Sequence, residues 1–384
     1  MLPIDRPFLT DTLRALVRIN SVNPALEPGA PGEADVVRYL AALFAAWGLD
    51  VDVFDAAPGR PNIVGRLSGT GGGRSLMLNA HTDTVDVNAM SDPFSGDLRD
   101  GRVYGRGAFD MKGGLAAALA AVKALIDARV PLGGDVVVAA VADEEFASVG
   151  TQALVARHRT DGAIVTEPTD LDICIAHKGF IWLQVTTVGR AAHGSRFDLG
   201  IDANMRMGRV LSELEVLERS LRTGRRHPLV GPASLHAATL HGGTGPSTYA
   251  ASSTLEIERR TIPGETDGDA VAEIQAILDR LGAADRAFSA ELRLLLSRPA
   301  FEISPDAPLV SLVTDCATSV LGRAPAHVGQ TWWMDSAFLA AAGIETVVLG
   351  GCGTGAHAAE EWCDVESLCH VAQTVAETAA RYCR

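Results

Sequence analysis

The sequence predicts an α/β protein in which helices sandwich a mostly parallel sheet, with a smaller α+β segment inserted into it. Three observations carry this prediction. Segments with strand and helix character alternate over the first half of the chain. Continuous apolar runs such as 135–142 are typical of strands that are covered on both faces. The order of elements changes near Lys178 and changes back near Pro308.

In the larger part, helices and strands are expected from the spacing of apolar residues. The glycine-rich segment 69–73 stands between two expected strands and lacks the lysine of a phosphate-binding loop. We therefore expect it to connect a hairpin. The expected helices are 8–19, 33–47, 115–126 and 149–157, and the expected strands are 62–67, 75–80, 135–142, 162–166 and 345–350.

Between Lys178 and Pro308 the expected elements form a set of their own. Strands and helices no longer alternate one by one there, which is typical of an α+β arrangement. We expect 1–179 and 300–384 to form one domain and 180–299 to form the insertion. The inserted strands are expected at 181–188, 234–240, 253–259 and 290–297, and the inserted helices at 204–221 and 269–281.

Composition excludes several classes of function. The formal net charge is −14 and the chain has no basic run, so nucleic acid is not an expected partner. The N-terminus lacks the regions of a signal peptide, and the longest apolar run, 115–125, is short and contains Lys123. We expect neither export nor a membrane span. The six cysteines lack paired spacing, which favours reduced thiols and a cytoplasmic location.

Metal-binding side chains follow the C-terminal ends of expected strands, where open α/β sheets place their sites. Asp110 stands at the junction of a glycine-rich loop and an alanine-rich helix, and taken alone it is equally well explained as a helix N-cap. A single histidine after a strand is usually structural, but several carboxylates at one edge repel each other unless cations neutralise them. The residues at strand ends are His81, Asp83, Asp143, Glu144, Glu145, Glu167 and His357.

Imidazole and carboxylate donors together suit zinc, with cobalt or manganese as alternatives. Two cations that share one carboxylate would polarise a carbonyl group and make a water molecule acidic near neutral pH. Of the adjacent Glu144 and Glu145, one can bind metal while the other accepts a proton, and amide hydrolysis needs both roles. The sequence therefore predicts a hydrolytic enzyme with two divalent cations.

Six motifs, in order from His81 to Glu361, resemble those of one enzyme family. This family comprises the dizinc deacylases and exopeptidases typified by acetylornithine deacetylase, succinyl-diaminopimelate desuccinylase, aminoacylase-1 and glutamate carboxypeptidase. The combination is specific, whereas His-x-Asp or Glu-Glu alone is weak. The motifs are His81-Thr-Asp-Thr-Val, Gly105-Arg-Gly-Ala-Phe-Asp-Met-Lys-Gly-Gly, Asp143-Glu-Glu, Thr166-Glu-Pro, Gly189-Arg-Ala-Ala-His-Gly-Ser and Gly353-Thr-Gly-Ala-His-Ala-Ala-Glu-Glu.

The resemblance implies a zinc-exopeptidase-like fold and a role for each site residue. Asp110 would bridge the two cations and would be followed by a cis peptide bond. Glu144 would act as the general base. Asp83 would hold the ring of a metal-binding histidine and so fix its tautomer. The other ligands would be His81 and Glu167 for one cation and Glu145 and His357 for the second.

The inserted segment resembles the family's lid and dimerisation domain. His193 matches a lid histidine that stabilises the oxyanion, in dimeric members by reaching in from the other subunit. Arg260 matches a lid arginine that binds the substrate carboxylate through two hydrogen bonds. Ser247 falls where the family has an asparagine, so a contact made by that amide would be shortened or lost. The resemblance therefore implies a homodimer formed through the lid.

These expectations lead to one function and leave its rivals open. We expect a zinc-dependent amidohydrolase that removes the acyl group from an N-acyl amino acid, or from a related small amide with a free carboxylate. A dipeptidase or carboxypeptidase would use the same site. A binding protein that kept the fold without the chemistry would have lost Glu144 or a ligand, and neither is lost. A nucleotide-dependent enzyme would rely on the 69–73 loop.

Overall fold

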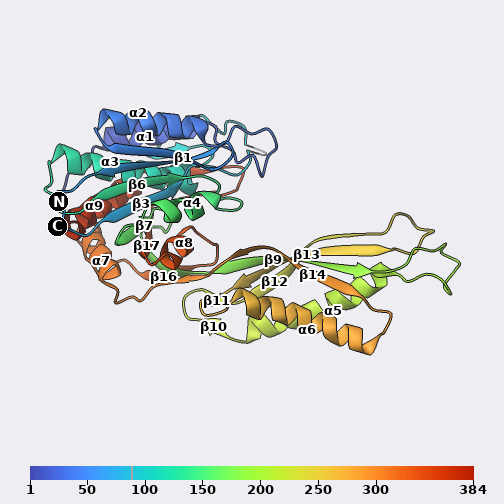
Figure 1. The fold of residues 1–384 in the computed structure, drawn as a ribbon. Helices are drawn as coiled ribbons and strands as arrows, with labels where there is room; N and C mark the ends of the chain where they lie inside the picture. Colours follow the sequence, from blue (N-terminus) through green and yellow to red (C-terminus); the bar gives the residue numbers. More distant parts are fainter. Residues whose placement is uncertain (88–89) are drawn as a thin grey trace. The chain divides into compact units, whose positions relative to one another are not determined.

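The computed structural model describes residues 1–87 and 90–384, and these divide into two compact units (Figure 1). The first unit comprises Met1–Ile175, Ile303–Val328 and Met334–Arg384, and the second comprises Ala176–Glu302 and Gly329–Trp333. Helices flank a central, mostly parallel sheet in the first unit, so the expected fold class is confirmed. The second unit spans 180–299 and also includes 176–179, 300–302 and 329–333, which were expected in the larger domain.

Parallel pairing in the middle of the first unit's sheet brings several strand ends to one edge. The strands follow the order β1-β2-β6-β3-β7-β17-β8. The four central strands, β6, β3, β7 and β17, are parallel, whereas β1, β2 and β8 run antiparallel to their neighbours. The bounds are β1 Asp50–Ala57, β2 Arg60–Leu67, β3 Leu76–His81, β6 Val136–Val141, β7 Gly162–Val165, β8 Ile173–His177 and β17 Glu345–Leu349.

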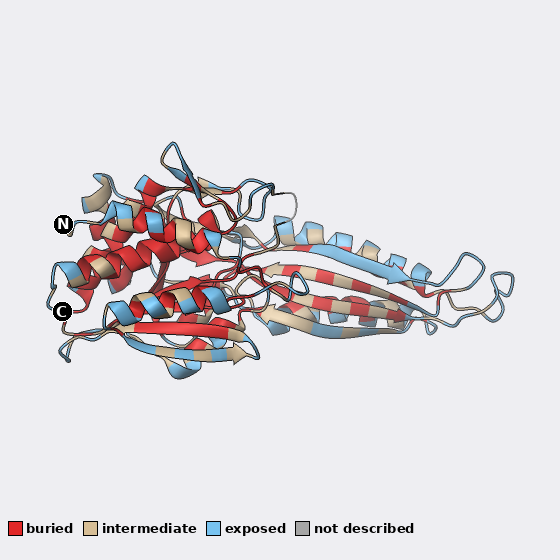
Figure 2. Cartoon of the chain, turned by 90° about the horizontal axis from the view of Figure 1, so that it is seen from above, coloured by how far each residue is buried: buried red, intermediate tan, exposed pale blue. Residues whose placement is uncertain are grey.

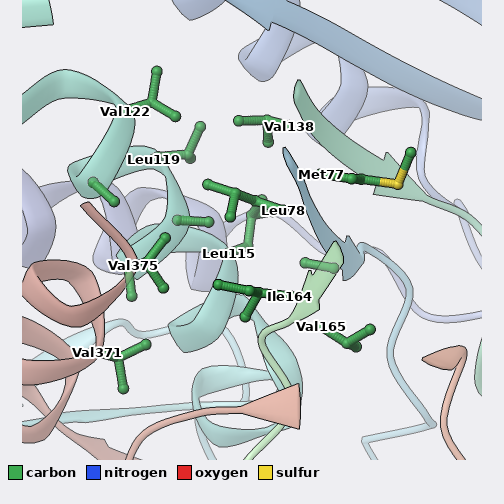
Figure 3. Close-up of a cluster of buried hydrophobic side chains, with 14 of the residues drawn as sticks. Met77, Leu78, Leu115, Leu119, Val122, Val138, Ile164, Val165, Val371 and Val375 are labelled. Carbon is green, nitrogen blue, oxygen red and sulfur yellow. The ribbon is translucent and has the colours of Figure 1, made fainter. Parts of the chain in front are cut away.

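Both faces of this sheet are covered. Leu78 and Ile164 are register partners on β3 and β7, and they point toward Leu115 of helix α3 (Figure 3). Met77 points to the opposite face, as strand alternation requires, and it is also fully buried (Figure 3). The helices of the first unit are α1 Arg6–Arg18, α2 Ala34–Ala46, α3 Gly113–Asp127, α4 Val149–Arg157, α7 Pro308–Leu321, α8 Ser336–Ala341 and α9 Val365–Tyr382.

The start of α3 approaches the sheet so closely that only glycine fits. A Cβ atom on Gly114 would lie 1.9 Å from the carbonyl oxygen of Thr166, which directly follows β7. No real Cβ atom tolerates that separation, so a larger residue would push the helix away from the strand. Gly114 thereby sets the distance between the turn that carries Asp110 and the strand end that carries Glu167.

The second unit is an antiparallel sheet in the order β12-β13-β9-β14, with two helices packed on it (Figure 1). Burial alternates along β9 and β13, which shows that one face of the sheet is covered and the other is more open (Figure 2). Helix α6 begins with a capping box between Thr266 and Asp269. The bounds are β9 Gly179–Val188, β12 Ser234–Gly242, β13 Ser252–Thr261, β14 Ala290–Arg298, α5 Ala203–Thr223 and α6 Asp267–Ala284.

Short strands complete the described elements. A small sheet in the order β18-β19-β5-β4 joins the segment before Asp110 to the segment after His357, because β5 pairs with β19. The short strands are β4 Asp97–Arg99, β5 Arg102–Tyr104, β10 Arg226–His227, β11 Gly231–Pro232, β15 Phe301–Glu302, β16 His327–Gln330, β18 Gly353–Thr354 and β19 Trp362–Asp364.

The expected hairpin across 69–73 is wrong, because β6 lies between β2 and β3. The apolar strand β6 is fully buried, and the middle of the sheet is where such a strand is covered on both faces. The 69–73 segment bonds instead to the loop before β6: Thr70 N–H donates to the carbonyl of Leu132 at 2.9 Å, and Gly71 N–H donates to that of Gly133 at 2.7 Å.

Two expectations about the whole chain can also be compared with the structure. All six cysteines are free thiols. Within residues 1–87 and 90–384, no helix combines the length and the apolar character needed to cross a membrane.

Candidate metal centre

The first unit brings the predicted metal ligands and the proposed base together at the carboxyl edge of its sheet. His81 is the last residue of β3, and Glu167 comes two residues after β7 ends. Asp110 lies in an irregular turn, Ala108–Lys112, that leads into α3. The peptide bond after Asp110 is cis, as the resemblance implied. The remaining members are Glu144 and Glu145, in the turn after β6, and His357, in the loop between β18 and β19.

Asp110 lies between the two histidines, and each of its carboxylate oxygens faces one of them. Its Oδ1 is 3.2 Å from His81 Nε2, and its Oδ2 is 3.4 Å from His357 Nε2. A second carboxylate accompanies each histidine: Glu167 Oε1 is 3.5 Å from His81 Nε2, and Glu145 Oε2 is 3.0 Å from His357 Nε2. The arrangement therefore offers two neighbouring donor sets that share one carboxylate.

Glu144 also belongs to this cluster. Its carboxylate and the ligand atoms of His81 and Glu167 all lie within 4.8 Å of one another. The same limit holds for the ligand atoms of His81, Asp110 and Glu145. Glu144 is thus close enough to act on a molecule held beside His81 and Glu167.

Burial disfavours the ionised carboxylates of this cluster. Burial raises the pKa of Glu144 and Glu167 well above the usual range, and it raises that of Glu145 to about 7. Burial also opposes ionisation of Asp110, but hydrogen bonds with the two histidines outweigh it and hold the Asp110 pKa well below its usual value. The hydrogen bond with Asp110 in turn raises the pKa of His357 to about 10.

The donor set fits divalent cations. Imidazole nitrogens and carboxylate oxygens are the ligands that zinc takes in catalytic sites, and cobalt and manganese accept the same donors. Four buried carboxylates that repel one another would be neutralised by such ions more completely than by two protonated imidazoles.

Asp83 positions both glutamates of the turn after β6 through their backbones. Its Oδ1 accepts a hydrogen bond from Glu144 N–H at 3.1 Å, and its Oδ2 accepts one from Glu145 N–H at 3.2 Å. The ring of His81 is held mainly by the backbone of Asp83, because Nδ1 lies 3.0 Å from the carbonyl oxygen and 3.7 Å from the carboxylate. The carboxylate thus contacts the ring less closely than the backbone carbonyl does.

A buried network behind this turn was not expected from the sequence. Asn23 donates to Asp83 Oδ2 at 2.8 Å and to Asp143 Oδ1 at 3.0 Å. Arg60 donates to the same Asp143 oxygen at 2.9 Å and forms a buried ion pair with Glu33. These residues are far apart in sequence and carry no spacing signal, so only the fold reveals that they act together.

The predicted oxyanion histidine, His193, and the two predicted substrate-binding residues, Ser247 and Arg260, all lie in the second unit. His193 and Ser247 are exposed neighbours: His193 forms a β-bridge with Thr248, and Gly194 N–H donates to the carbonyl of Ser247 at 2.7 Å. Arg260 lies near the opposite end of β13, where its Nε is 2.7 Å from Glu258 Oε1. The two ends of one lid therefore carry different predicted functional groups.

Comparison with known proteins agrees with this site. Residues 77–381 match peptidase family M20/M25/M40. An N-formyl-4-amino-5-aminomethyl-2-methylpyrimidine deformylase from Bacillus subtilis is 28% identical over 93% of this chain and 91% of its own length. An acetylornithine deacetylase from Myxococcus xanthus is 29% identical over 98% of each chain.

Solved structures share the fold. A tripeptidase from Staphylococcus aureus superposes with a TM-score of 0.80 and 22% identity, covering 98% of this chain and 99% of its own. The family match spans most of the chain and contains every predicted ligand, and the expected family is therefore confirmed. This protein belongs to peptidase family M20/M25/M40 and is a hydrolase that acts on amide bonds.

Proposed function

We propose that this enzyme is a dizinc deacylase that releases an acyl group from an N-acyl amino acid. The observation that carries the proposal is the position of Asp110, whose two carboxylate oxygens face two different histidines, each accompanied by a further carboxylate. This is the donor arrangement that a pair of cations with one shared ligand requires.

The proposed ligands divide into two sets around Asp110. His81 and Glu167, which lie 3.5 Å apart, would hold one cation, and Glu145 and His357, which lie 3.0 Å apart, would hold the other. Zinc is the proposed metal, and cobalt or manganese would accept the same donors. When bound, the cations polarise the amide carbonyl and make a water molecule more acidic.

Glu144 is the proposed proton carrier. It takes a proton from the attacking water and returns it to the leaving amine, so one side chain serves both halves of the reaction. Its backbone N–H is fixed by Asp83, and its carboxylate lies within 4.8 Å of the ligand atoms of His81 and Glu167. This placement supports a base beside the metal that His81 would hold.

The lid supplies the remaining proposed contacts, and its internal geometry favours a dimer. His193 would donate to the oxyanion, Ser247 would lie beside it, and Arg260 would bind the substrate carboxylate. Ten residues of β13 extend about 30 Å at roughly 3.3 Å each, and the two functional groups lie toward opposite ends of this strand. A small amide cannot span that length. His193 and Arg260 would therefore come from different chains of a homodimer.

The relatives, and not the shape of the fold, support the proposed substrate class. The relative that is 28% identical is named as a deformylase, and the one that is 29% identical is named as a deacetylase. The tripeptidase shows only a shared fold at its lower identity. A dipeptidase or glutamate-type carboxypeptidase with the same metal site is the alternative. The bond it would cleave, like that of an N-acyl amino acid, is an amide close to a free carboxylate.

A hydrolysis screen tests the proposal. N-acetyl, N-succinyl and N-formyl amino acids would be compared with dipeptides and with a formylated aminopyrimidine, which carries no carboxylate. Each assay would be run with zinc, cobalt or manganese and again after chelation. We expect the acylated amino acids to be the best substrates, with activity lost on chelation and regained on adding metal. Full activity without metal would contradict the mechanism, and preference for dipeptides would replace the deacylase with the alternative.

A further inference from the structure

The carboxylate of Glu361 is buried beneath the metal centre and accepts four hydrogen bonds. Its side chain is 1% exposed. Oε1 accepts from the backbone N–H of Phe109 at 2.9 Å and from that of Asp110 at 3.0 Å. Oε2 accepts from Gly107 N–H at 3.0 Å and from Arg106 Nη1 at 2.7 Å. One side chain therefore holds most of the turn that presents Asp110.

Glu361 and Arg106 also connect this turn to the loop of His357. His357 lies in a tight turn in which Ala358 N–H donates to the carbonyl of Gly355 at 2.9 Å, and Glu361 follows this turn. Arg106 Nη2 donates to the carbonyl of Ala358 at 3.0 Å, and Gly105 N–H donates to the carbonyl of Glu361 at 3.0 Å. The two loops are thus joined by side-chain and backbone hydrogen bonds, in all of which the loop of Asp110 donates and the loop of His357 accepts.

We propose that Glu361 is a positioning residue that fixes the separation of Asp110 and His357, and hence the cation site between them. The inference rests on the proposed metal centre and adds a role that neither strand ends nor ligand spacing would assign. Two ligands on different loops bind one cation well only if the loops hold still relative to each other. Glu361 supplies that constraint without touching the cation.

The isosteric variant Glu361→Gln keeps the size of the side chain but removes its charge and part of its capacity to accept hydrogen bonds. Whichever way the amide turns, its NH2 group faces either Gly107 N–H with Arg106 or Phe109 N–H with Asp110 N–H, so two donors lose their acceptor. The buried guanidinium of Arg106 also loses its counter-charge. Glu361→Asp keeps the charge but is one methylene shorter, so it serves as the second variant if Glu361→Gln does not fold.

Asp135 provides a control for the loss of a structural carboxylate. Its carboxylate also accepts one backbone N–H, from Gly69 at 3.0 Å, and one arginine, Arg66 at 3.2 Å, although it is more exposed than that of Glu361 (31% against 1%). It precedes β6, at the opposite end of that strand from the proposed ligands. Asp135→Asn therefore removes a structural carboxylate and leaves the proposed ligands in place.

The experiment measures zinc affinity by competition with a coloured chelator, the melting temperature of the metal-free protein, and kcat and KM with the best substrate of the screen. We expect both Glu361 variants to bind zinc at least about tenfold more weakly, with kcat reduced and KM changed much less. We expect Asp135→Asn to lower the melting temperature without changing zinc affinity.

Wild-type zinc affinity in both Glu361 variants would overturn the proposal, and so would an equal loss of affinity in Asp135→Asn. If the wild-type protein binds no divalent cation, the proposed metal centre fails first and this inference fails with it. If wild type binds zinc and hydrolyses amides while the variants match it, only the role of Glu361 is refuted.

Discussion

Glu144 and Glu145 are adjacent in sequence, yet their carboxylates have different neighbours. Glu145 Oε2 lies 3.0 Å from His357 Nε2, whereas Glu144 clusters with His81 and Glu167. The carboxylate of Asp83 accepts a hydrogen bond from each of their backbone N–H groups. One buried carboxylate thus fixes the backbone of both residues, while their carboxylates have different nearest partners, as the proposed roles of ligand and base require.

Substituting each glutamate by glutamine tests that division. Glu144→Gln removes the proton acceptor but keeps a neutral oxygen, so we expect kcat to fall about 10²- to 10⁴-fold while two metal ions per chain remain bound. Glu145→Gln removes an anionic ligand, so we expect weaker binding of one cation. Elemental analysis after dialysis against limiting zinc measures both. Equal metal loss in the two variants would make Glu144 a ligand and leave the reaction without the proposed base.

If Arg260 binds the substrate carboxylate, the enzyme should prefer substrates with a free carboxylate over their amides. A charge-assisted contact contributes about 1.5–3 kcal/mol, which is roughly a 10- to 150-fold preference for the free acid over its amide in kcat/KM. We expect this preference in the wild-type enzyme and near-equal values in Arg260→Met. Arg219→Met removes an exposed charge from α5 and should keep the preference. A wild-type enzyme indifferent to amidation would exclude Arg260 from substrate binding.

At the scale of elements, the junction of α3 and β7 sets the geometry of the site. Gly114→Ala would place a methyl group against the Thr166 carbonyl, so we expect a destabilisation of about 1–3 kcal/mol and weaker metal binding. A Cβ atom on Gly208, which is exposed on α5, would meet no other atom within 4 Å, so Gly208→Ala should stabilise by about 0.5–1 kcal/mol. The urea denaturation midpoints of Gly114→Ala and Gly208→Ala would be compared with that of the wild type. An unchanged midpoint in Gly114→Ala would show that α3 can move away from β7 without loss of stability.

Elements with strong periodicity were predictable, and pairing between distant segments was not. Helix α4 and the lid strands follow directly from apolar spacing, because local patterns determine them. Strand β1 was not predicted, although its residues alternate between polar and apolar as those of a strand do; at the sheet edge its apolar Val51 and Val53 are exposed. The hairpin across 69–73 was predicted wrongly because nothing in the local sequence indicates that β6 inserts between β2 and β3.

The site also contains some residues that the sequence could indicate and others that it could not. The predicted ligands stand in recognisable motifs, so the sequence could indicate them. The residues that hold those ligands could not be indicated, because Asn23, Arg60 and Glu361 act through contacts that span many positions. Glu361 lies within a quoted motif, yet only the hydrogen bonds of its carboxylate reveal what it holds.

At the scale of the whole molecule, the second unit carries two proposed functional groups toward opposite ends of one strand. The pairing of β9 with β13 continues past the sheet toward the tip, where Tyr249 N–H donates to the carbonyl of Ala192 at 3.0 Å. His193 lies beyond that bond, whereas Arg260 pairs with Phe180 at the other end of the ladder. If both groups serve one substrate, one of them has to come from a second chain.

Mixing inactive variants tests this arrangement. His193→Ala and Glu144→Gln would be combined under conditions that allow subunits to exchange. A mixed dimer then holds one site with an intact base and a partner histidine, so we expect about a quarter of the wild-type activity, because half of the dimers are mixed and each has one complete site. The matched control combines Arg260→Met with Glu144→Gln. If Arg260 acts in the chain that carries the base, this pair should regain nothing above its residual activity. Restoration in both mixtures, or in neither once mixed dimers are shown to form, would contradict a lid that serves two different active sites.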